Sequence, residues 1–354
     1  MGAATVLKDR SKAGARYVAH VYNPRTWKEK GLPWLAGLAV VTGVIIMGAL
    51  AWYWSYEPRL FDVRSIASQE GQGSTKPVPG YITTATALHV AETLLDKRGG
   101  YLSNDVTPPS VFLDNVPNWE FGALVQLRDL SRSMRNYFSR SRTQSVEDRD
   151  LMQADPKFHF DSESWIFPTT ESMYRDGVKH LRRYMQRLTD ENKTDGQFYA
   201  RADNLQEHLT IVGQRLGSLA MRLSAAVGQR RLDMDLFGER GREEAKTGEA
   251  TRIKTPWLEV DDVFYEARGS TWALAHILKA LQYDFADVLA DKNAETILAQ
   301  LVSELESAQD PLWSPMVLNG GDFSMVANHS LNLSSYVSRA NNAVIDLIRV
   351  LKEG

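Results

Sequence analysis

The stretch GLPWLAGLAVVTGVIIMGALAWYW, residues 31–54, contains two dozen residues and no charged side chain. A helix of this length spans about 36 Å at 1.5 Å per residue, which is enough to cross the ~30 Å hydrocarbon layer of a bilayer. Aromatic rings that favour the headgroup level stand at its two ends, and they are Trp34, Trp52, Tyr53 and Trp54. The stretch predicts a transmembrane helix over 31–56 with these four residues as membrane-interface anchors.

Two other interpretations of this stretch fit less well. A buried core helix seldom runs so long without a polar residue. A cleaved signal peptide has a shorter apolar region, and it has small residues at the position where this chain has Trp-Tyr-Trp. We therefore expect one helix to hold the chain in a membrane, so that the lipid bilayer is its first partner.

The flanks of this helix predict its orientation. Residues 1–30 form a basic tail with two acidic residues and seven basic ones, Lys8, Arg10, Lys12, Arg16, Arg25, Lys28 and Lys30. The segment 57–76 on the other side has three basic residues. Because Lys and Arg gather on the cytoplasmic side of a membrane, the tail is predicted to be cytoplasmic. In a Gram-negative cell, this is a single-pass inner-membrane protein with a periplasmic C-terminal domain.

Length and composition restrict what the rest of the chain can do. About 300 of the 354 residues follow the apolar stretch, which is enough for one large or two modest domains. A net charge of −3 argues against the broad basic face of a nucleic-acid binder, so no nucleic-acid partner is expected. The chain has no cysteine, which excludes disulfides, thiolate metal sites and a cysteine nucleophile.

The segment 57–80 predicts a flexible linker, because Gly, Ser and Pro accumulate towards its end. From Tyr81 onward, apolar residues recur at helical spacing, and the clearest stripe is Leu205, Leu209, Val212, Leu216, Leu219 and Leu223. No window alternates with period two. We therefore expect an all-α fold, in which residues 81–354 form a bundle of about seven main helices with long Pro/Trp/Asn-containing loops.

One segment inside this bundle has a different composition. Residues 237–256 (FGERGREEAKTGEATRIKTP, with Phe237 first) are charged and almost free of large apolar side chains. Such a segment cannot bury enough apolar surface to offset the entropy lost on ordering. It predicts a mobile excursion between helices.

No specific catalytic motif is present. The chain lacks GxSxG, GxxxxGK[ST], HExxH and a GxGxxG that follows a strand. Its seven histidines are scattered and no two are spaced i, i+4, so a metal-binding pair on one helix is absent. We expect no cofactor, no metal and no catalytic residue.

The best candidate for an interaction site is the loop Tyr101–Gly122 (YLSNDVTPPSVFLDNVPNWEFG), which is too rich in Pro, Asn and Asp to be a helix. Loops held between helices in this way are often binding surfaces, although a structural clasp over the bundle is the alternative. The candidate residues are Tyr101, Asn104, Asp105, Asp114, Asn115, Asn118, Trp119 and Glu120. Asn118 is expected to cap the following helix. In the loop 143–170, the rings of Phe158, Phe160, Trp165 and Phe167 are expected to pack onto the bundle.

The carboxylates of the first loop allow an enzymatic alternative. Asp105, Asp114 and Glu120 stand near aromatic rings, and a glycan hydrolase needs paired carboxylates beside such rings. The simpler interpretation gives the same residues roles in turns and at a helix terminus. We therefore expect a non-enzymatic scaffold or adaptor that binds another envelope protein, the cell wall or a second copy of itself. A peptidoglycan or glycan hydrolase and an apolar-ligand carrier are the alternatives.

Several strings of the chain are distinctive. They are GYITTAT (80–86), ETLLDK (92–97), GGYLSND (99–105), DNVPNWEFG (114–122), LRDLSR (127–132) and FYARADNL (198–205). In these strings the chain resembles a family of single-pass inner-membrane proteins of Gram-negative proteobacteria that is catalogued as a domain of unknown function. The resemblance runs from the anchor to the C-terminus, and it implies an inner-membrane location. It supplies no catalytic residues.

Overall fold

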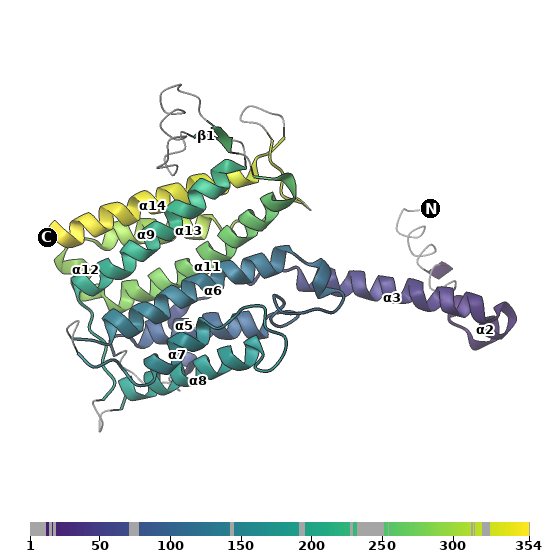
Figure 1. Cartoon of the computed structure of the whole chain (residues 1–354), viewed down its shortest axis with the longest axis horizontal. Helices are drawn as coiled ribbons and strands as arrows, with labels where there is room; N and C mark the ends of the chain where they lie inside the picture. The colour runs from purple at the N-terminus through teal and green to yellow at the C-terminus, as the bar shows by residue number, and fades with distance from the viewer. Residues whose placement is uncertain are drawn as a thin grey trace, which may run out of the picture. The chain divides into compact units, whose positions relative to one another are not determined.

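The structure is a computed structural model of the whole chain. It describes residues 12–13, 16, 19–70, 78–141, 145–190, 195–226, 229–231, 251–253, 255–312, 314, 316–320 and 326–353. The chain forms two compact units, Met1–Trp54 and Ser55–Gly354. Figure 1 labels most of the helices of both units and the strand β1.

The first unit contains the long apolar helix. A short helix, α2 (Pro24–Lys30), begins where the side chain of Asn23 accepts a hydrogen bond from the Arg25 N–H at 3.0 Å. It ends at Gly31, whose φ of 78° breaks the helical path. The next helix, α3 (Leu32–Trp54), has 23 residues and none of them is buried. Among the described residues, α3 is the one helix long and apolar enough to cross a membrane, and its place near the N-terminus fits a membrane anchor or a signal sequence.

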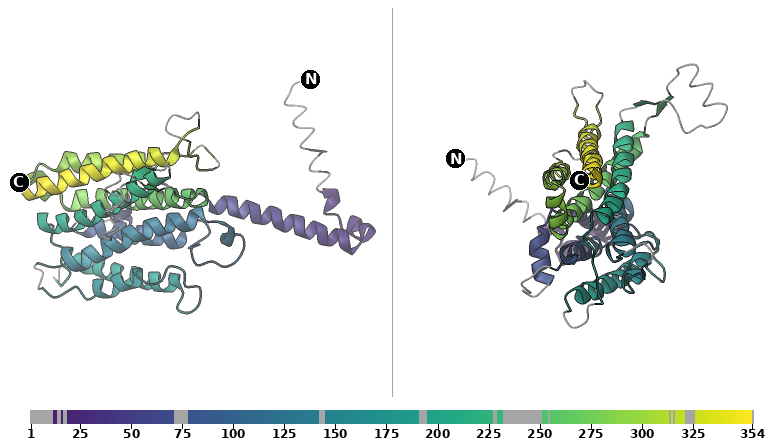
Figure 2. Two further views of the ribbon diagram at one scale, coloured as in Figure 1. Left: turned by 45° about the horizontal axis from the view of Figure 1, so that its top comes forward. Right: turned by 90° about the vertical axis from the view of Figure 1, so that its left-hand side faces the viewer.

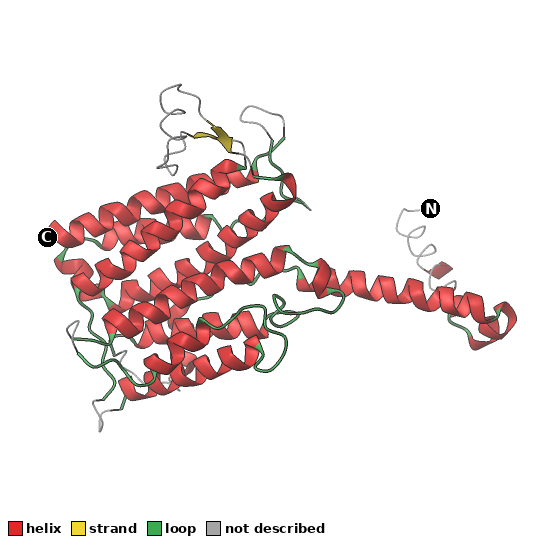
Figure 3. Ribbon diagram, in the orientation of Figure 1, coloured by secondary structure: helices red, strands yellow, loops and turns green. Residues whose placement is uncertain are grey.

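The second unit is a bundle of helices, and the predicted all-α fold is confirmed (Figure 3). Its helices are α4 (Val63–Glu70), α5 (Tyr81–Asp96), α6 (Asn115–Ser133), α7 (Leu151–Phe158), α8 (Thr170–Leu188), α9 (Ala202–Ala225), α11 (Val260–Asp284), α12 (Ala286–Asp291), α13 (Glu295–Ser307) and α14 (His329–Glu353). Short turns η1 (Ser110–Phe112) and η3 (Trp257–Glu259) precede α6 and α11, and a π-helical turn, η2 (Met134–Phe138), extends α6. Every leucine and valine of the stripe on α9 is buried, as its spacing predicts.

The helices are arranged around α11, which packs against α6, α13 and α5. On one side of it, α14 packs against both α9 and α13. On the other side, α8 packs against α7 and α5. Figures 1 and 2 show this arrangement, with the long helices running along the bundle. The loops that join them therefore gather at its two ends.

Two glycines allow α6 and α11 to cross at very short range. A Cβ on Gly269 would lie 1.9 Å from the carbonyl oxygen of Trp119, and a Cβ on Gly122 would lie 2.0 Å from that of Glu266. The Ser270 hydroxyl donates a hydrogen bond to the Gly122 carbonyl at 3.1 Å. Because neither backbone can move without losing this contact, the crossing fixes the first turns of α6, and with them the end of the loop that precedes it.

The prediction of a flexible linker over 57–80 is wrong for residues 57–70, which pack on the bundle. The Phe61 ring stacks on His276 with 3.7 Å between centroids, and the Phe61 N–H donates to the His276 Nε2 at 2.9 Å. Glu57 forms an ion pair with Arg268, and α4 buries Val63. These partners lie some two hundred residues away in the sequence, so local composition gave no sign of them. Residues 71–77 lie outside the described residues.

A small antiparallel ribbon interrupts the all-helical pattern. Strand β1 (Gln229–Arg231) pairs with β2 (Thr251–Ile253), with Arg230 opposite Arg252. The predicted excursion 237–256 therefore contains a strand near its end. Residues 237–250 and 254, the greater part of that excursion, lie outside the described residues.

Candidate functional site

The first turns of α6 lie inside the predicted loop Tyr101–Gly122. The helix begins at Asn115, and the side chain of Asp114 accepts a hydrogen bond from the Asn115 N–H at 2.9 Å. Pro117 is tolerated because the N–H groups of a first helical turn have no intrahelical acceptor. The predicted cap at Asn118 is therefore wrong, and the irregular part of the loop ends at Asp114.

Glu120 is fully buried, and it fastens the loop to the bundle. Its carboxylate forms an ion pair with Lys97, whose side chain is also buried. It also accepts hydrogen bonds from the backbone N–H groups of Leu102 and Ser103, each at 2.8 Å, and from the Ser103 hydroxyl. Both oxygens have partners, as a buried carboxylate requires. Glu120 therefore holds the segment 97–104 against α6 and has no oxygen free to act as an acid or base.

Tyr101 and Asn104 connect this loop to the loop that precedes α8. The Tyr101 hydroxyl donates to the carbonyl of Ser162 at 3.1 Å, and burial raises the pKa of Tyr101 well above its ordinary value. The Asn104 amide donates to the carbonyl of Ser164 at 3.0 Å and to the carboxylate of Glu171 at 2.9 Å. Both side chains are buried. These contacts are those of a clasp between two loops.

The other five candidate residues do not form one cluster. Trp119 is buried against Trp272, with 5.0 Å between ring centroids. Asn118 is half-buried and donates to a carboxylate oxygen of Asp262 at 2.6 Å, which connects the start of α6 to the start of α11. Asn115 is half-buried, whereas Asp105 and Asp114 are exposed. The exposed carboxylates of this loop are thus separated from the buried rings that a sugar-stacking site would need.

Apolar side chains that were not among the predicted site residues are also exposed in the same loop. Phe112 has 74% of its surface exposed, and Val106 and Val111 are also exposed. Phe158, the last residue of α7, is buried as expected. In the loop before α8, Trp165 and Phe167 are exposed, so their predicted packing on the bundle is wrong. Trp257 and Leu258, in the turn before α11, are exposed as well. A large exposed apolar patch is a feature that marks interaction surfaces.

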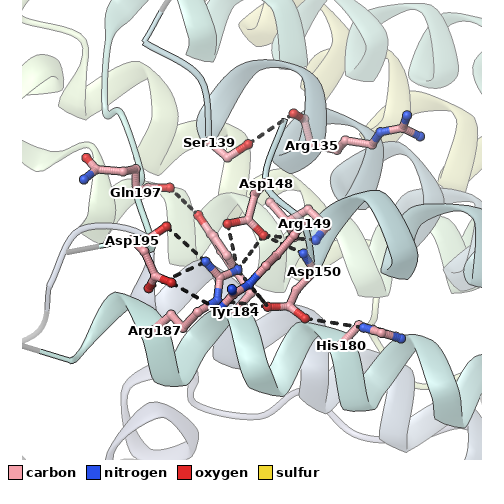
Figure 4. Close-up of polar contacts among 11 residues, drawn as sticks. Arg135, Ser139, Asp148, Arg149, Asp150, His180, Tyr184, Arg187, Asp195 and Gln197 are labelled. Carbon is pink, nitrogen blue, oxygen red and sulfur yellow. Dashed lines mark hydrogen bonds and ion pairs between the residues drawn. The ribbon is translucent and has the colours of Figure 1, made fainter. Parts of the chain in front are cut away.

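A dense ion network lies at the other end of the bundle, around Arg187 in the last turn of α8 (Figure 4). The guanidinium donates to both oxygens of Asp148, at 2.6 and 2.7 Å, and to Asp150 at 2.9 Å. It also donates to the carbonyl of Asp195 at 3.0 Å, while His180 lies 3.5 Å from Asp150. The charges largely neutralise one another, and the contacts join α8 to the chain segments on either side of it. We interpret the network as structural.

Two hollows lie on either side of Arg268. Each has a volume of about 400 Å³, and residues of 307–314 line both of them. One is bounded by α14, including Tyr336 and Arg339, and the other by residues 55–60. The guanidinium of Arg268 is engaged with Glu57 and with the carbonyls of Ala308, at 3.0 Å, and Asp310, at 2.8 Å. The polar group shared by the two hollows is thus already satisfied.

Two buried histidines are candidates for titration but not for ligation. His276 accepts from the Phe61 N–H with Nε2, and its Nδ1 lies 2.7 Å from the carbonyl of Trp272, so the ring is neutral with its proton on Nδ1. Burial lowers the pKa of His276 to about 4, and burial lowers that of His208 to about 4 as well. Among the residues that the structure describes, no three His, Asp or Glu side chains are grouped to hold a metal ion.

Comparison of the chain with known protein families gives a match over most of its length. Residues 27–354 match the model of a family described as "Uncharacterized protein conserved in bacteria (DUF2333)". No curated protein and no solved structure shows a significant match to the chain.

Proposed function

Because the chain belongs to the bacterial family of uncharacterized proteins DUF2333, we propose its function from its own geometry: it is a single-pass inner-membrane protein whose helical unit is a non-enzymatic scaffold or adaptor. The observation that carries the proposal is α3, which has 23 residues, no charge and no buried side chain. An apolar helix of this length, which the described part of the chain leaves uncovered, is suited to a lipid environment.

The orientation follows from the charges that flank α3. The basic residues of 1–30 stay on the cytoplasmic side, so Ser55 to Gly354 lies in the periplasm. An alkaline-phosphatase reporter fused after Gly354 tests this, because that enzyme folds only outside the cytoplasm. We expect an active fusion that remains in the membrane pellet after alkaline carbonate extraction. An inactive but normally expressed fusion would reverse the orientation, and extraction into the supernatant would refute the anchor.

The adaptor role is supported by the way the loop 97–114 is built. Glu120, Tyr101 and Asn104 fasten it to the bundle from inside, while Asp105 and Asp114 remain exposed on a rigid support. A preorganised loop of this kind loses little conformational entropy on binding a partner. The same geometry argues against a glycan hydrolase, since Glu120 is committed to Lys97.

Affinity purification from detergent-solubilised membranes tests the adaptor role. The bait is the full chain, and the test variant combines Asp105→Ala with Asp114→Ser, in which Ser preserves the helix cap. The matched control combines Asp287→Ala with Asp291→Ala, two exposed acidic residues at the opposite end of the bundle. We expect a stoichiometric partner that is retained by the control and lost by the test variant.

Two outcomes would contradict this proposal. Equal recovery of the partner by the test variant and the control would exclude the loop as the binding surface. Cleavage of purified peptidoglycan by the wild-type protein would show that the chain is an enzyme, and a Glu120→Gln variant would then separate a catalytic carboxylate from a structural one.

A further inference from the structure

The exposed aromatic rings of the second unit are not spread over its surface. In the described part of Ser55–Gly354, four aromatic side chains have more than half of their surface exposed: Phe112, Trp165, Phe167 and Trp257. Phe167 reaches 94% and Trp257 reaches 80%. Exposed aliphatic residues accompany them in the same three loops, and we call the whole set the aromatic rim: Val106, Val111, Phe112, Trp165, Ile166, Phe167, Trp257 and Leu258.

The three loops of the aromatic rim lie at one end of the bundle. They precede α6, α8 and α11, whose first turns are at the same end in Figures 1 and 2. The hydrogen bond from Asn118 to Asp262 joins the starts of α6 and α11. The bond from Tyr101 to the carbonyl of Ser162 joins the loop before α6 to the loop before α8. All residues of the aromatic rim therefore lie at the same end of the bundle.

The chain enters the second unit at this same end. Glu57 pairs with Arg268, and Phe61 contacts His276, so residues 57–61 run along α11 in the direction of its C-terminus. The residues that precede Glu57 therefore lie nearer to the start of α11, which follows the turn that contains Trp257. Arg98, just after α5, covers the ring of Tyr56 at 5.1 Å. Ser55 is bonded directly to Trp54, the last residue of α3.

We propose that the aromatic rim inserts into the interface of the lipid bilayer that holds α3. This inference rests on the membrane anchor proposed above, because the bond between Trp54 and Ser55 keeps this end of the bundle within a few residues of the bilayer. Amphipathic Trp rings favour the headgroup level, and Phe and Ile side chains favour the acyl boundary beneath it. Loop tips held by buried contacts can enter that layer without first being ordered.

The charges beside the rim indicate which lipid it meets. Its loops carry exposed acidic residues, Asp105, Asp114, Asp161 and Glu259, and the turn before α11 has no basic residue between Thr255 and Asp262. Exposed basic residues, Arg59 and Arg98, lie at the same end, so the charges beside the rim are mixed and do not select for anionic headgroups. The rim is therefore suited to a zwitterionic surface, and its insertion does not depend on anionic lipid.

The absence of native cysteine makes the test direct. Single cysteines replace Phe112, Phe167 or Trp257, a nitroxide label is attached, and the full chain is reconstituted into phosphatidylcholine vesicles. Collisions of each label with oxygen, which concentrates in the bilayer, and with a water-soluble nickel chelate report its depth. Val146→Cys is the matched aqueous control, because Val146 is 91% exposed and follows the other end of α6. Ile45→Cys in α3 reports the anchor independently.

We expect the labels at 112, 167 and 257 to collide several-fold less with the nickel chelate than the label at 146, and more with oxygen. Rim labels as accessible to the chelate as the label at 146 would overturn the proposal, and a deep label at 45 in the same preparation would leave the anchor standing. An aqueous label at 45 would refute the anchor, and the rim labels would still be decided by their own collisions. Rim labels shielded from both reagents would show contact with protein instead of lipid, which also overturns the proposal.

Discussion

Residues 97–104 and residues 106–112 follow one another in the same loop, but they have opposite relations to the bundle. The first segment is polar, and its Tyr101, Leu102 and Asn104 are buried. The second segment contains Val106, Val111 and Phe112, all exposed. Polar groups of a loop can be buried when a buried partner such as Glu120 forms hydrogen bonds with them. Apolar side chains of the loop remain exposed to solvent where the bundle has no space in which they can pack. In this loop, the exposure of a side chain depends on the buried partners that the bundle offers it and does not follow from residue type alone.

Removal of Glu120 is expected to have the largest effect on stability, because this residue fastens the buried segment 97–104. In Glu120→Ala, Lys97 stays buried without a counter-ion, and the N–H groups of Leu102 and Ser103 lose their acceptor. Breaking a buried ion pair on one side costs about 3–5 kcal/mol in the free energy of unfolding. Asp105 lies in the same loop but is exposed, so Asp105→Ala should change the free energy of unfolding by less than about 0.5 kcal/mol. Urea unfolding measures both, and equal effects would mean that the segment 97–104 is not fastened from inside.

The next effect concerns the helix crossing that supports the buried segment. Gly269→Ala forces a Cβ against the carbonyl of Trp119, and we expect a loss of about 3 kcal/mol in unfolding free energy from the resulting shift of α6. Gly217→Ala in α9 is the control, because its Cβ would lie 3.7 Å from Asn341 in ordinary contact. It should stabilise the unit by about 0.5–1 kcal/mol, since Ala is the better helix former. Stabilisation by both substitutions would refute the close crossing.

A smaller effect tests whether residues 57–61 are docked. The pKa of His276 is lowered to about 4 by burial, against about 6.5 in the unfolded chain. Between these values the unfolded state binds more protons than the folded one, so stability is present at neutral pH and is lost as pH falls. Between pH 7 and pH 5, we expect His276 to contribute a loss of about 2 kcal/mol. His276→Gln, whose amide oxygen can still accept from Phe61, should lack this loss.

The comparison of wild type with His276→Gln is needed because other buried groups titrate in the same range. His208 acts in the same direction, and Asp284, whose pKa burial raises to about 6, acts in the opposite one. Both are present in the two proteins, so their contributions cancel in the difference. Identical pH profiles for wild type and variant would show that His276 is not buried and that the segment 57–61 is free.

The smallest expected effect is at the exposed half of the loop. Phe112→Ser and Phe167→Ser should each change the unfolding free energy by no more than about 0.5 kcal/mol in detergent, because both rings face solvent there. Leu102→Ala is the contrast, with an expected loss of about 2–5 kcal/mol for a buried leucine. Thermal unfolding of the three variants checks this order. A large loss at Phe112 would place that ring inside the bundle.

The sequence predicted the helices well because apolar periodicity is a local signal. The stripe from Leu205 to Leu223 is buried along its whole length, and the uncharged stretch 31–54 is helical apart from Gly31. The candidate site was predicted less well, because its contacts join distant residues. Glu120 meets Lys97, and Phe61 meets His276, 215 residues away. Composition does not reveal such pairs.

The aromatic residues of the loop before α8 illustrate the same limit. Phe158 ends α7 and is buried, whereas Phe167 lies nine residues further on and is almost fully exposed. Both are phenylalanines in a polar, irregular stretch, so the sequence alone assigned them the same environment. The geometry of the loop separates them, because it buries Phe158 in the core and leaves the Phe167 ring in solvent.

The most direct test of the contrast between the two halves of the loop is a pair of thiol-labelling rates in the folded protein. Leu102→Cys and Phe112→Cys are introduced separately into the cysteine-free chain, and each purified protein is treated with a maleimide in detergent. The buried position should react only as fast as the unit opens, and the exposed position should react at the rate of a free thiol. Equal rates at the two positions would contradict the division of this loop into an inner clasp and an outer surface.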